Sequence, residues 1–210
     1  PYLKNKSKVE LDAETKMELA KNIKSLFLGK IGYIISTASD NLVISSFISI
    51  KTVGLYSNYT TLTSSVSGFV STFISSISAS IGNLIAKESS EKIYEIFKVT
   101  SFINFWMYGW SSICLFCLSE SFIILWLGEQ YLMGKKVLFL IVFNFLINGL
   151  MAPIDSIKSA AGIYHPDRYI PLISAIVNMV ISIALVKSYG ISGVFIGTLI
   201  STILFNFWIK

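Results

Sequence analysis

Six apolar segments follow a polar stretch of about 25 residues at the beginning of the chain. An α-helix needs about 20 apolar residues to cross the hydrocarbon core of a bilayer, and each segment is close to or above that length. Helices also satisfy their own backbone hydrogen bonds in lipid. The pattern therefore predicts an all-α, polytopic membrane protein. Its six transmembrane helices would form one bundle, with spans at about 26–50, 60–86, 99–119, 136–161, 169–187 and 191–209.

The polar stretch, residues 1–25, mixes lysines with acidic residues. From its second half onward, Met17, Ala20, Ile23 and Phe27 share one helical face. This pattern favours an amphipathic helix on the membrane surface that leads into the first span. A solvated linker is the alternative. In either case we expect residues 1–25 to form a cytoplasmic linker ahead of the bundle.

Composition supports a membrane protein and offers little catalytic chemistry. Hydrophobic residues make up 53% of the chain and charged residues 14%, whereas soluble domains average about 25% charged residues. Cys114 and Cys117 lie within an apolar segment, where two buried thiols are more common than a metal site. His165 is the only histidine, and no phosphate-binding loop is present. We therefore expect no metal, no cofactor, no nucleic-acid partner and no enzymatic activity.

Basic residues are unevenly distributed between the predicted loops. If the N-terminus is cytoplasmic, the outer loops hold only Lys51, Lys135, Lys136 and Lys187, and the remaining lysines lie at the cytoplasmic side. Cytoplasmic loops of membrane proteins carry the excess of Lys and Arg. The distribution therefore predicts that both termini are cytoplasmic.

The fourth span carries a polar face and two helix-breaking residues. Small and polar residues three or four positions apart share that face: Asn144, Asn148, Ala152, Asp155, Ser159 and Gly162. Gly149 and Pro153 predict a kink, because Pro153 cannot donate to the carbonyl of Gly149, which then needs another partner. The kink would serve as a hinge if the chain alternates access. A static kink is the other interpretation.

Asp155 and Lys158 lie one turn apart just beyond this kink. Ionisable groups are expensive within a membrane and indicate function by default. In the functional interpretation, Lys158 meets an anionic headgroup. In the structural one, the two residues form an ion pair and Lys158 extends toward the membrane surface.

Asp40 lies near the centre of the first span, with Asn41 beside it. A carboxylate facing lipid at that depth would be costly, so this face should point into the bundle or into a wet cavity. Asp40 would then couple a proton or cation, or form a polar wall for substrate. A hydrogen-bonded packing residue is the alternative. In the fifth span Asn178 lies on a similar polar face, between Ser174 and Ser182.

Short strings along nearly the whole chain are familiar. In order they are SDNLVIS at 39–45, VGLYSNY at 53–59, SIGNLIA at 80–86, LWLG at 125–128, AAGIYHPDRY at 160–169 and YGISGVFIGT at 189–198. Together they resemble the polysaccharide-export flippases of the MOP (multidrug/oligosaccharidyl-lipid/polysaccharide) superfamily. The resemblance implies twelve or more spans in two bundles that face each other across a cavity. The six spans here would be the second, C-terminal bundle.

The resemblance also implies a cargo and a route. The cargo would be an undecaprenyl-pyrophosphate-linked oligosaccharide, flipped across the bacterial plasma membrane by alternating access and driven by H⁺ or Na⁺. The expected partners are membrane lipid, this lipid-linked oligosaccharide and the N-terminal bundle. Lys30 and Arg168, with Lys158, would neutralise pyrophosphate at the cytoplasmic entrance, and Gly149 and Pro153 would form the hinge. The expected substrate or ion pathway consists of Asp40, Asn41, Asn144, Asn148, Asp155, Lys158 and Asn178.

Three other functions compete with this one. An ion-coupled multidrug exporter of the same superfamily would have a cavity rich in acids and aromatics. A membrane enzyme of polysaccharide synthesis would need a cluster of catalytic His, Asp or Glu at one face of the membrane, which the sequence lacks. A non-transporting assembly subunit would have no cavity between the bundles.

Overall fold

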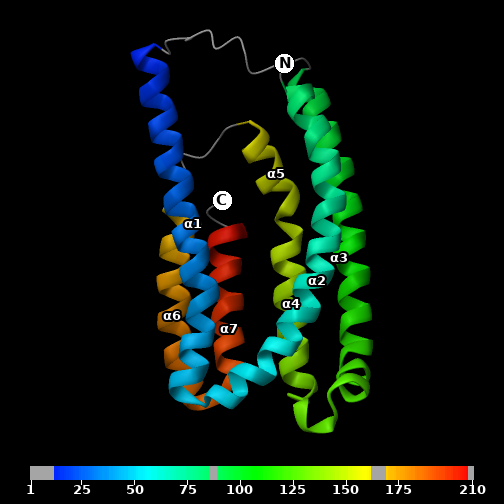
Figure 1. Cartoon of the computed structure of the whole chain (residues 1–210). Helices are drawn as coiled ribbons and strands as arrows, with labels where there is room; N and C mark the ends of the chain where they lie inside the picture. The colour runs from blue at the N-terminus through cyan, green and yellow to red at the C-terminus, as the bar shows by residue number, and fades with distance from the viewer. Residues whose placement is uncertain (1–11, 86–88, 162–168, 208–210) are drawn as a thin grey trace, which may run out of the picture.

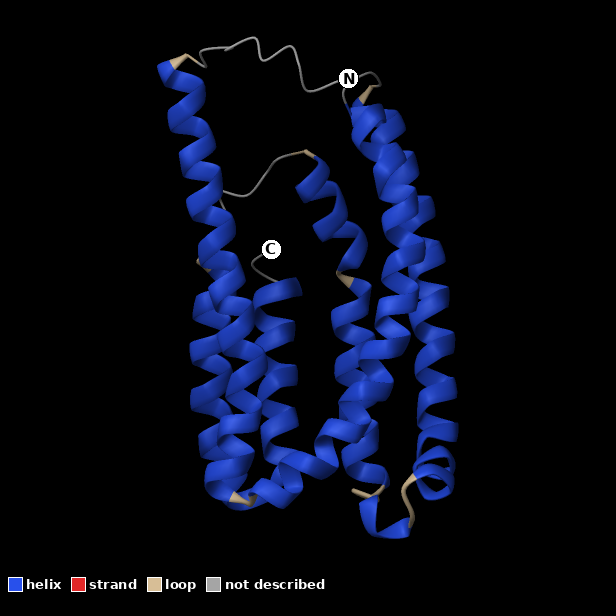
Figure 2. Ribbon diagram, viewed as in Figure 1, coloured by secondary structure: helices blue, strands red, loops and turns tan. Residues whose placement is uncertain are grey.

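The computed structural model describes residues 12–85, 89–161 and 169–207. Every regular element in these ranges is helical (Figure 2). The elements are α1 (Ala13–Phe47), α2 (Ile50–Ile85), α3 (Ser90–Trp126), η1 (Glu129–Tyr131), α4 (Lys135–Leu150), α5 (Ala152–Ala160), α6 (Ile170–Tyr189), α7 (Ile191–Thr202) and the π-helical turn η2 (Ile203–Phe207). The all-α prediction is confirmed.

Each expected span overlaps a helix, but the first three helices extend beyond the apolar segments. α1 begins at Ala13, where Asp12 accepts a hydrogen bond from the Ala13 amide at 2.8 Å, so the helical part of the expected linker is continuous with the first span. α3 begins at Ser90, ahead of its apolar run. An existing helix adds one hydrogen bond for each residue that joins it, so polar flanks extend it at little cost.

By length and composition, three helical segments of the described chain can cross a membrane: Glu91–Trp126, Lys135–Ser159 and Ile170–Tyr189. A shorter apolar helix covers Ile191–Phe205. These segments indicate an all-α membrane protein, and the count of six spans stays a prediction. α1 and α2 are less apolar because they carry many of the chain's serines, threonines and ionisable residues.

The helices form two groups that lie side by side (Figure 1). The first group is α1, α6 and α7, and the second is α2, α3, α4 and α5. The short turn from α1 to α2 joins them at one end. At the opposite end lie the start of α1, the end of α2 and the start of α3. We call these the joined end and the open end.

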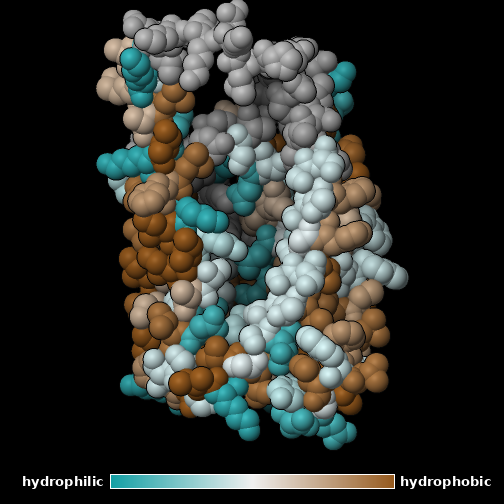
Figure 3. Space-filling view, viewed as in Figure 1, coloured by the Kyte–Doolittle hydropathy of each residue, from teal (hydrophilic) through white to brown (hydrophobic). Residues whose placement is uncertain are grey.

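The apolar core is concentrated toward the joined end. One cluster draws residues from both helix groups, including Ile44 of α1, Tyr59 of α2, Leu138 of α4 and Val194 of α7. A second cluster, of Val70, Ile74, Tyr108 and Phe145, lies within the second group. The two groups therefore pack tightly near the joined end. Figure 3 shows a hollow between them, flanked by apolar surface, with light and teal polar residues inside it.

Candidate functional site

Asp40 of α1 lies at the meeting point of the two helix groups and accepts hydrogen bonds from two other helices. Its side chain is 7% exposed. The amide nitrogen of Asn178 on α6 donates to Oδ1 at 3.1 Å, and the hydroxyl of Thr198 on α7 lies 3.1 Å from both carboxylate oxygens. Burying a charged group is costly unless it is hydrogen-bonded. These donors provide that compensation.

The Asp40 centre is Asp40, Asn178, Thr198, Ser182 and the Val194 carbonyl. The Thr198 hydroxyl also lies 3.2 Å from Asn178 Oδ1 and 3.1 Å from the Val194 carbonyl oxygen. Ser182 donates toward the same amide and carbonyl oxygens at 3.1 and 3.2 Å. A hydroxyl carries one proton, so Thr198 can serve only one of these acceptors at a time. Asn178 also donates to the Ser39 hydroxyl at 3.3 Å. One amide proton and two hydroxyl protons then remain for four acceptor oxygens, so the centre has more acceptors than its donors can satisfy.

A cavity of about 680 Å³ opens beside Asp40, between the two helix groups. All the larger helices except α3 contribute to it. Its polar lining residues are Tyr33, Ser36, Thr37, Asp40 and Asn41 on α1, Tyr56, Ser57 and Thr60 on α2, Asn148 and Asp155 on α4 and α5, Ser174 on α6, and Thr198 and Thr202 on α7. Asp40 and Asp155 are its only charged lining residues in the described ranges.

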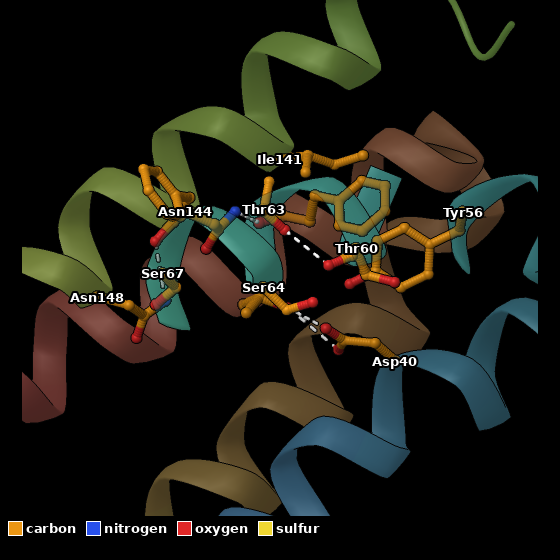
Figure 4. A pocket seen from close by; sticks show the side chains of 12 residues that line it. Asp40, Tyr56, Thr60, Thr63, Ser64, Ser67, Ile141, Asn144 and Asn148 are labelled. Atoms are coloured by element: carbon orange, nitrogen blue, oxygen red, sulfur yellow. Dashed lines mark hydrogen bonds between the residues drawn. The ribbon is translucent and has the colours of Figure 1, made fainter. Parts of the chain in front are cut away.

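A smaller pocket of about 270 Å³ adjoins this cavity and shares Asp40, Tyr56, Thr60, Asn148 and Thr198 with it. Figure 4 shows the side chains of this pocket converging from α1, α2 and α4. Several of its hydroxyls donate to backbone carbonyls of their own helix: Thr60 to Ser57, Thr63 to Thr60 and Ser64 to Thr61. Their oxygens then face the pocket as acceptors.

Asn144 also lines this smaller pocket. Its amide nitrogen donates to the carbonyls of Leu140 and Phe195 at 2.9 and 3.1 Å, whereas its buried Oδ1 has no hydrogen-bond partner. Because this oxygen is buried, it can gain a hydrogen-bond partner only if the neighbouring side chains move. The lining is thus richer in acceptors than in donors.

The predicted pathway residues are partly brought together. Asp40, Asn41, Asn148 and Asp155 line the large cavity, and Asn144 lines the adjoining pocket. Asn178 is fully buried behind Asp40 and holds its carboxylate.

The predicted basic residues lie elsewhere. Lys158 lines a separate groove between α3 and α5. The Lys30 ammonium lies 5.2 Å from the ring centroid of Tyr33, which places it beside the cavity wall. Arg168 lies outside the described residues.

The predicted kink is present, and the orphaned carbonyl has a partner from another helix. α4 ends at Leu150 and α5 begins at Ala152, with Pro153 in its first turn. The Gly149 carbonyl accepts a hydrogen bond of 2.9 Å from the buried amide of Asn104 on α3. Proline removes the donor that this carbonyl would otherwise use, and Asn104 replaces it.

The ring of Tyr108 covers the same glycine. A Cβ added at Gly149 would collide with that ring, so only glycine allows this approach. The Tyr108 hydroxyl is 3.2 Å from the Ser67 hydroxyl, and its ring packs on Phe145 with 5.0 Å between centroids. We call Asn104, Tyr108 and Gly149 the helix-break clamp.

Sequence reasoning missed Asn104, Tyr56 and Thr198 as site residues. Asn104 had a signal, since Thr100 four positions earlier makes a short polar face in an apolar helix, and both side chains are buried. The signal for Thr198 was weaker, because it consists only of one hydroxyl residue within the last apolar segment. Asn104 bonds to Gly149 across 45 positions and Thr198 to Asp40 across 158, and no local pattern reveals such pairs.

Comparison with known proteins identifies a family. The family model described as "Polysaccharide biosynthesis protein" matches residues 2–136, which is well over half of the chain and includes Asp40 and the first three long helices. No curated protein and no solved structure matches the chain. With the helices and the polar cavity described above, the match shows that this membrane protein belongs to the polysaccharide biosynthesis protein family.

Proposed function

We propose that this chain forms one bundle of a transporter that flips a lipid-linked oligosaccharide across the bacterial plasma membrane. The observation that carries this proposal is the polar cavity between the two helix groups, with Asp40 in its wall. A transporter of this kind needs a polar path for sugar through an apolar barrier. Neutral hydroxyl and amide groups on α1, α2 and α4 make such a path.

The cavity lining is better suited to bind the sugar part of this cargo than its pyrophosphate. Its only described charges are the two carboxylates, which would repel a pyrophosphate. The polyhydroxylated rings can instead donate hydrogen bonds to the acceptor oxygens of Thr60, Thr63 and Ser64. Lys30, beside the cavity wall at Tyr33, would meet the pyrophosphate near the entrance. An N-terminal bundle would supply the rest of the cavity.

Asp40 is our candidate for coupling to H⁺ or Na⁺. Carboxylate, amide and carbonyl oxygens lie within 3.2 Å of the Thr198 hydroxyl. Oxygen ligands suit hard cations, and a carboxylate also takes up a proton. Either event would neutralise Asp40 and change its hydrogen bonds to α6 and α7. With the N-terminus in the cytoplasm, the open end faces inward.

One observation favours a second candidate, an ion-coupled drug exporter. Two acids and the aromatic residues Tyr33 and Tyr56 line the large cavity, and an acidic aromatic cavity suits cationic drugs. The family match favours polysaccharide, so we rank the exporter second.

Complementation tests the proposal. The full-length gene should restore surface polysaccharide to a strain that lacks its own flippase, and Asp40→Asn should lower that polymer at least ten-fold at equal protein level. The matched control is Glu95→Gln, which removes an exposed acid of α3 that lines neither cavity. Normal polymer in Asp40→Asn would remove Asp40 from the mechanism. No restoration by the wild type, together with resistance to cationic drugs, would favour the exporter.

A further inference from the structure

The smaller pocket beside Asp40 is a side chamber of the central cavity. Its volume is about 270 Å³, against about 680 Å³ for the cavity. Residues that line the pocket and not the cavity include Thr63, Ser64 and Ser67 on α2, Ile141 and Phe145 on α4, and Phe195 on α7. We call it the α2–α4 pocket. Because pockets of about 300–1,000 Å³ hold drug-sized ligands, this one has room for a single small ring.

The α2 wall of this pocket presents hydroxyl oxygens that are ready to accept hydrogen bonds. The hydroxyl groups of Thr60, Thr63 and Ser64 each donate to a backbone carbonyl of α2, at 3.0, 3.2 and 3.1 Å. A hydroxyl has one proton and two lone pairs, so these groups keep acceptor capacity after their protons are used. In Figure 4 they gather in the middle of the pocket, with Tyr56 and Asn148 on either side. A ligand held there must itself bring donors.

Tyr56 and Asn148 supply polar groups that the described chain leaves without a partner. Both residues line the pocket and the cavity, so they lie where the two spaces meet. Asn148 uses one amide N–H on the Asn144 carbonyl at 2.9 Å, and its Oδ1 accepts no hydrogen bond within the described chain. The Tyr56 hydroxyl makes none there either. These groups are therefore available to a ligand that enters from the cavity.

The rest of the pocket lining is mostly apolar and aromatic. Ile141, Phe145 and Phe195 contribute to it, and the Tyr56 ring packs against Phe195 with 4.9 Å between ring centroids. A pyranose ring matches this lining, because its faces consist of C–H groups and its rim carries hydroxyl donors. Asp40 is the only charged residue of the described lining, and its carboxylate would repel a ring with a carboxylate of its own. The lining therefore favours a neutral sugar over a uronic acid.

We propose that the α2–α4 pocket binds one neutral pyranose ring of the cargo. A C–H face of the ring lies against the aromatic lining, and its hydroxyl groups donate to the hydroxyl oxygens of α2. Tyr56 and Asn148 bind the part of the rim that faces the cavity. The proposal rests on the proposed function and deepens it, because it assigns one ring of the oligosaccharide to this pocket and excludes acidic rings from it.

Binding of simple glycosides to the purified full-length protein tests this specificity. Ligand-observed NMR compares methyl glycosides of glucose, galactose and mannose with the methyl glycosides of their uronic acids. At least one neutral glycoside should bind, about ten-fold more tightly than its uronic acid, which corresponds to about 1.4 kcal/mol. Asp40→Asn removes the charge and should abolish most of that difference. The proposal is overturned if no neutral glycoside binds, or if wild type binds the uronic acids equally well.

Two pairs of variants on α2 locate the binding. Ser64→Trp fills the pocket and should abolish glycoside binding, whereas Ser65→Trp, at an exposed position that lines neither space, should leave it unchanged. Thr63→Val removes one acceptor and should weaken binding about five-fold, the factor for about 1 kcal/mol from one hydrogen bond. Its control is Thr72→Val, which removes a hydroxyl that also donates to a carbonyl of α2 but lies outside both spaces. Equal effects within either pair would contradict the assignment of the ring to this pocket.

Complementation separates this proposal from the proposed function. If the wild type restores surface polysaccharide, Ser64→Trp should lower that polymer at equal protein level and Ser65→Trp should not. Normal polymer in Ser64→Trp would overturn the sugar subsite and leave the flippase proposal standing. Failure of the wild type to restore polymer would instead overturn the proposed function, and the glycoside measurements would then decide whether the pocket binds sugar.

Discussion

The Asp40 centre and the helix-break clamp meet the same physical problem in opposite ways. Both place a polar group without a local partner inside an apolar bundle, and both borrow donors from distant helices. At the clamp, the Asn104 amide donates to the Gly149 carbonyl, and the Tyr108 ring covers the α-carbon of the same residue. At the Asp40 centre the carboxylate keeps one side toward the cavity, and its donors have competing acceptors. A closed arrangement stabilises the fold, whereas an open one leaves the group available to a ligand.

This contrast predicts that changes at the clamp mainly lower stability and that changes at the Asp40 centre mainly lower transport. The comparison also concerns the predicted hinge at Gly149 and Pro153. Gly149 is held by hydrogen bonding and by packing, so in this conformation the kink is a fixed feature of α4 and α5. Its role as a hinge stays a prediction.

The largest loss of stability is expected from Gly149→Ala. The added methyl group collides with the Tyr108 ring, which is 3% exposed and packed against Phe145, so the ring has little room to move. We expect the free energy of unfolding to fall by about 3 kcal/mol, the upper end for overpacking. Thermal unfolding in detergent measures it. The control is Gly109→Ala on α3, where an added Cβ meets no atom within 4 Å. Equal melting temperatures for the two variants would refute the clamp.

A smaller loss, of about 2 kcal/mol, is expected from Asn104→Leu, because the buried Gly149 carbonyl loses its side-chain donor. Pro153→Ala restores a backbone N–H four residues beyond Gly149. The double variant Asn104→Leu/Pro153→Ala should therefore recover part of the loss. Thermal unfolding of both single variants and of the double variant measures the coupling. Strictly additive losses would mean that Asn104 does not replace the donor that proline removes.

At the Asp40 centre, Thr198→Val should cost about 1 kcal/mol of stability, since Asn178 still donates to the carboxylate. Surface polymer should fall several-fold, because the hydroxyl that connects Asp40 to α7 is gone. Thr198→Ser keeps that hydroxyl and should behave like wild type in both measurements. A stability loss as large as that of Asn104→Leu, with normal polymer, would reverse the contrast between the two regions.

The smallest stability effect is expected from Asn41→Ala, within about 0.5 kcal/mol, as for other exposed substitutions. Asn41 lines the cavity and is exposed, so its loss removes a contact for the ligand and little packing. Transport assays at limiting expression should show a modest reduction. A large drop in melting temperature would place Asn41 in the packing of the bundle instead.

The sequence alone determined the fold class, the approximate helices and the existence of a kink, because these follow from local rules. Apolar runs of membrane length require helices, and proline removes a specific backbone donor. The sequence also singled out Asp40, because a carboxylate within an apolar span needs hydrogen-bonding partners even before their identity is known. Six of the seven predicted pathway residues belong to the cavity, the adjoining pocket or the Asp40 centre.

The tertiary structure alone decided which partner each polar group received. Asp155 and Lys158 look like one feature in the sequence, yet their side chains line different spaces, because α5 packs between the cavity on one side and α3 on the other. Asn104 completes a helix break 45 positions away, and Thr198 reaches Asp40 across 158 positions. Helical periodicity fixes the face on which a residue lies, whereas packing of distant helices fixes what that face meets.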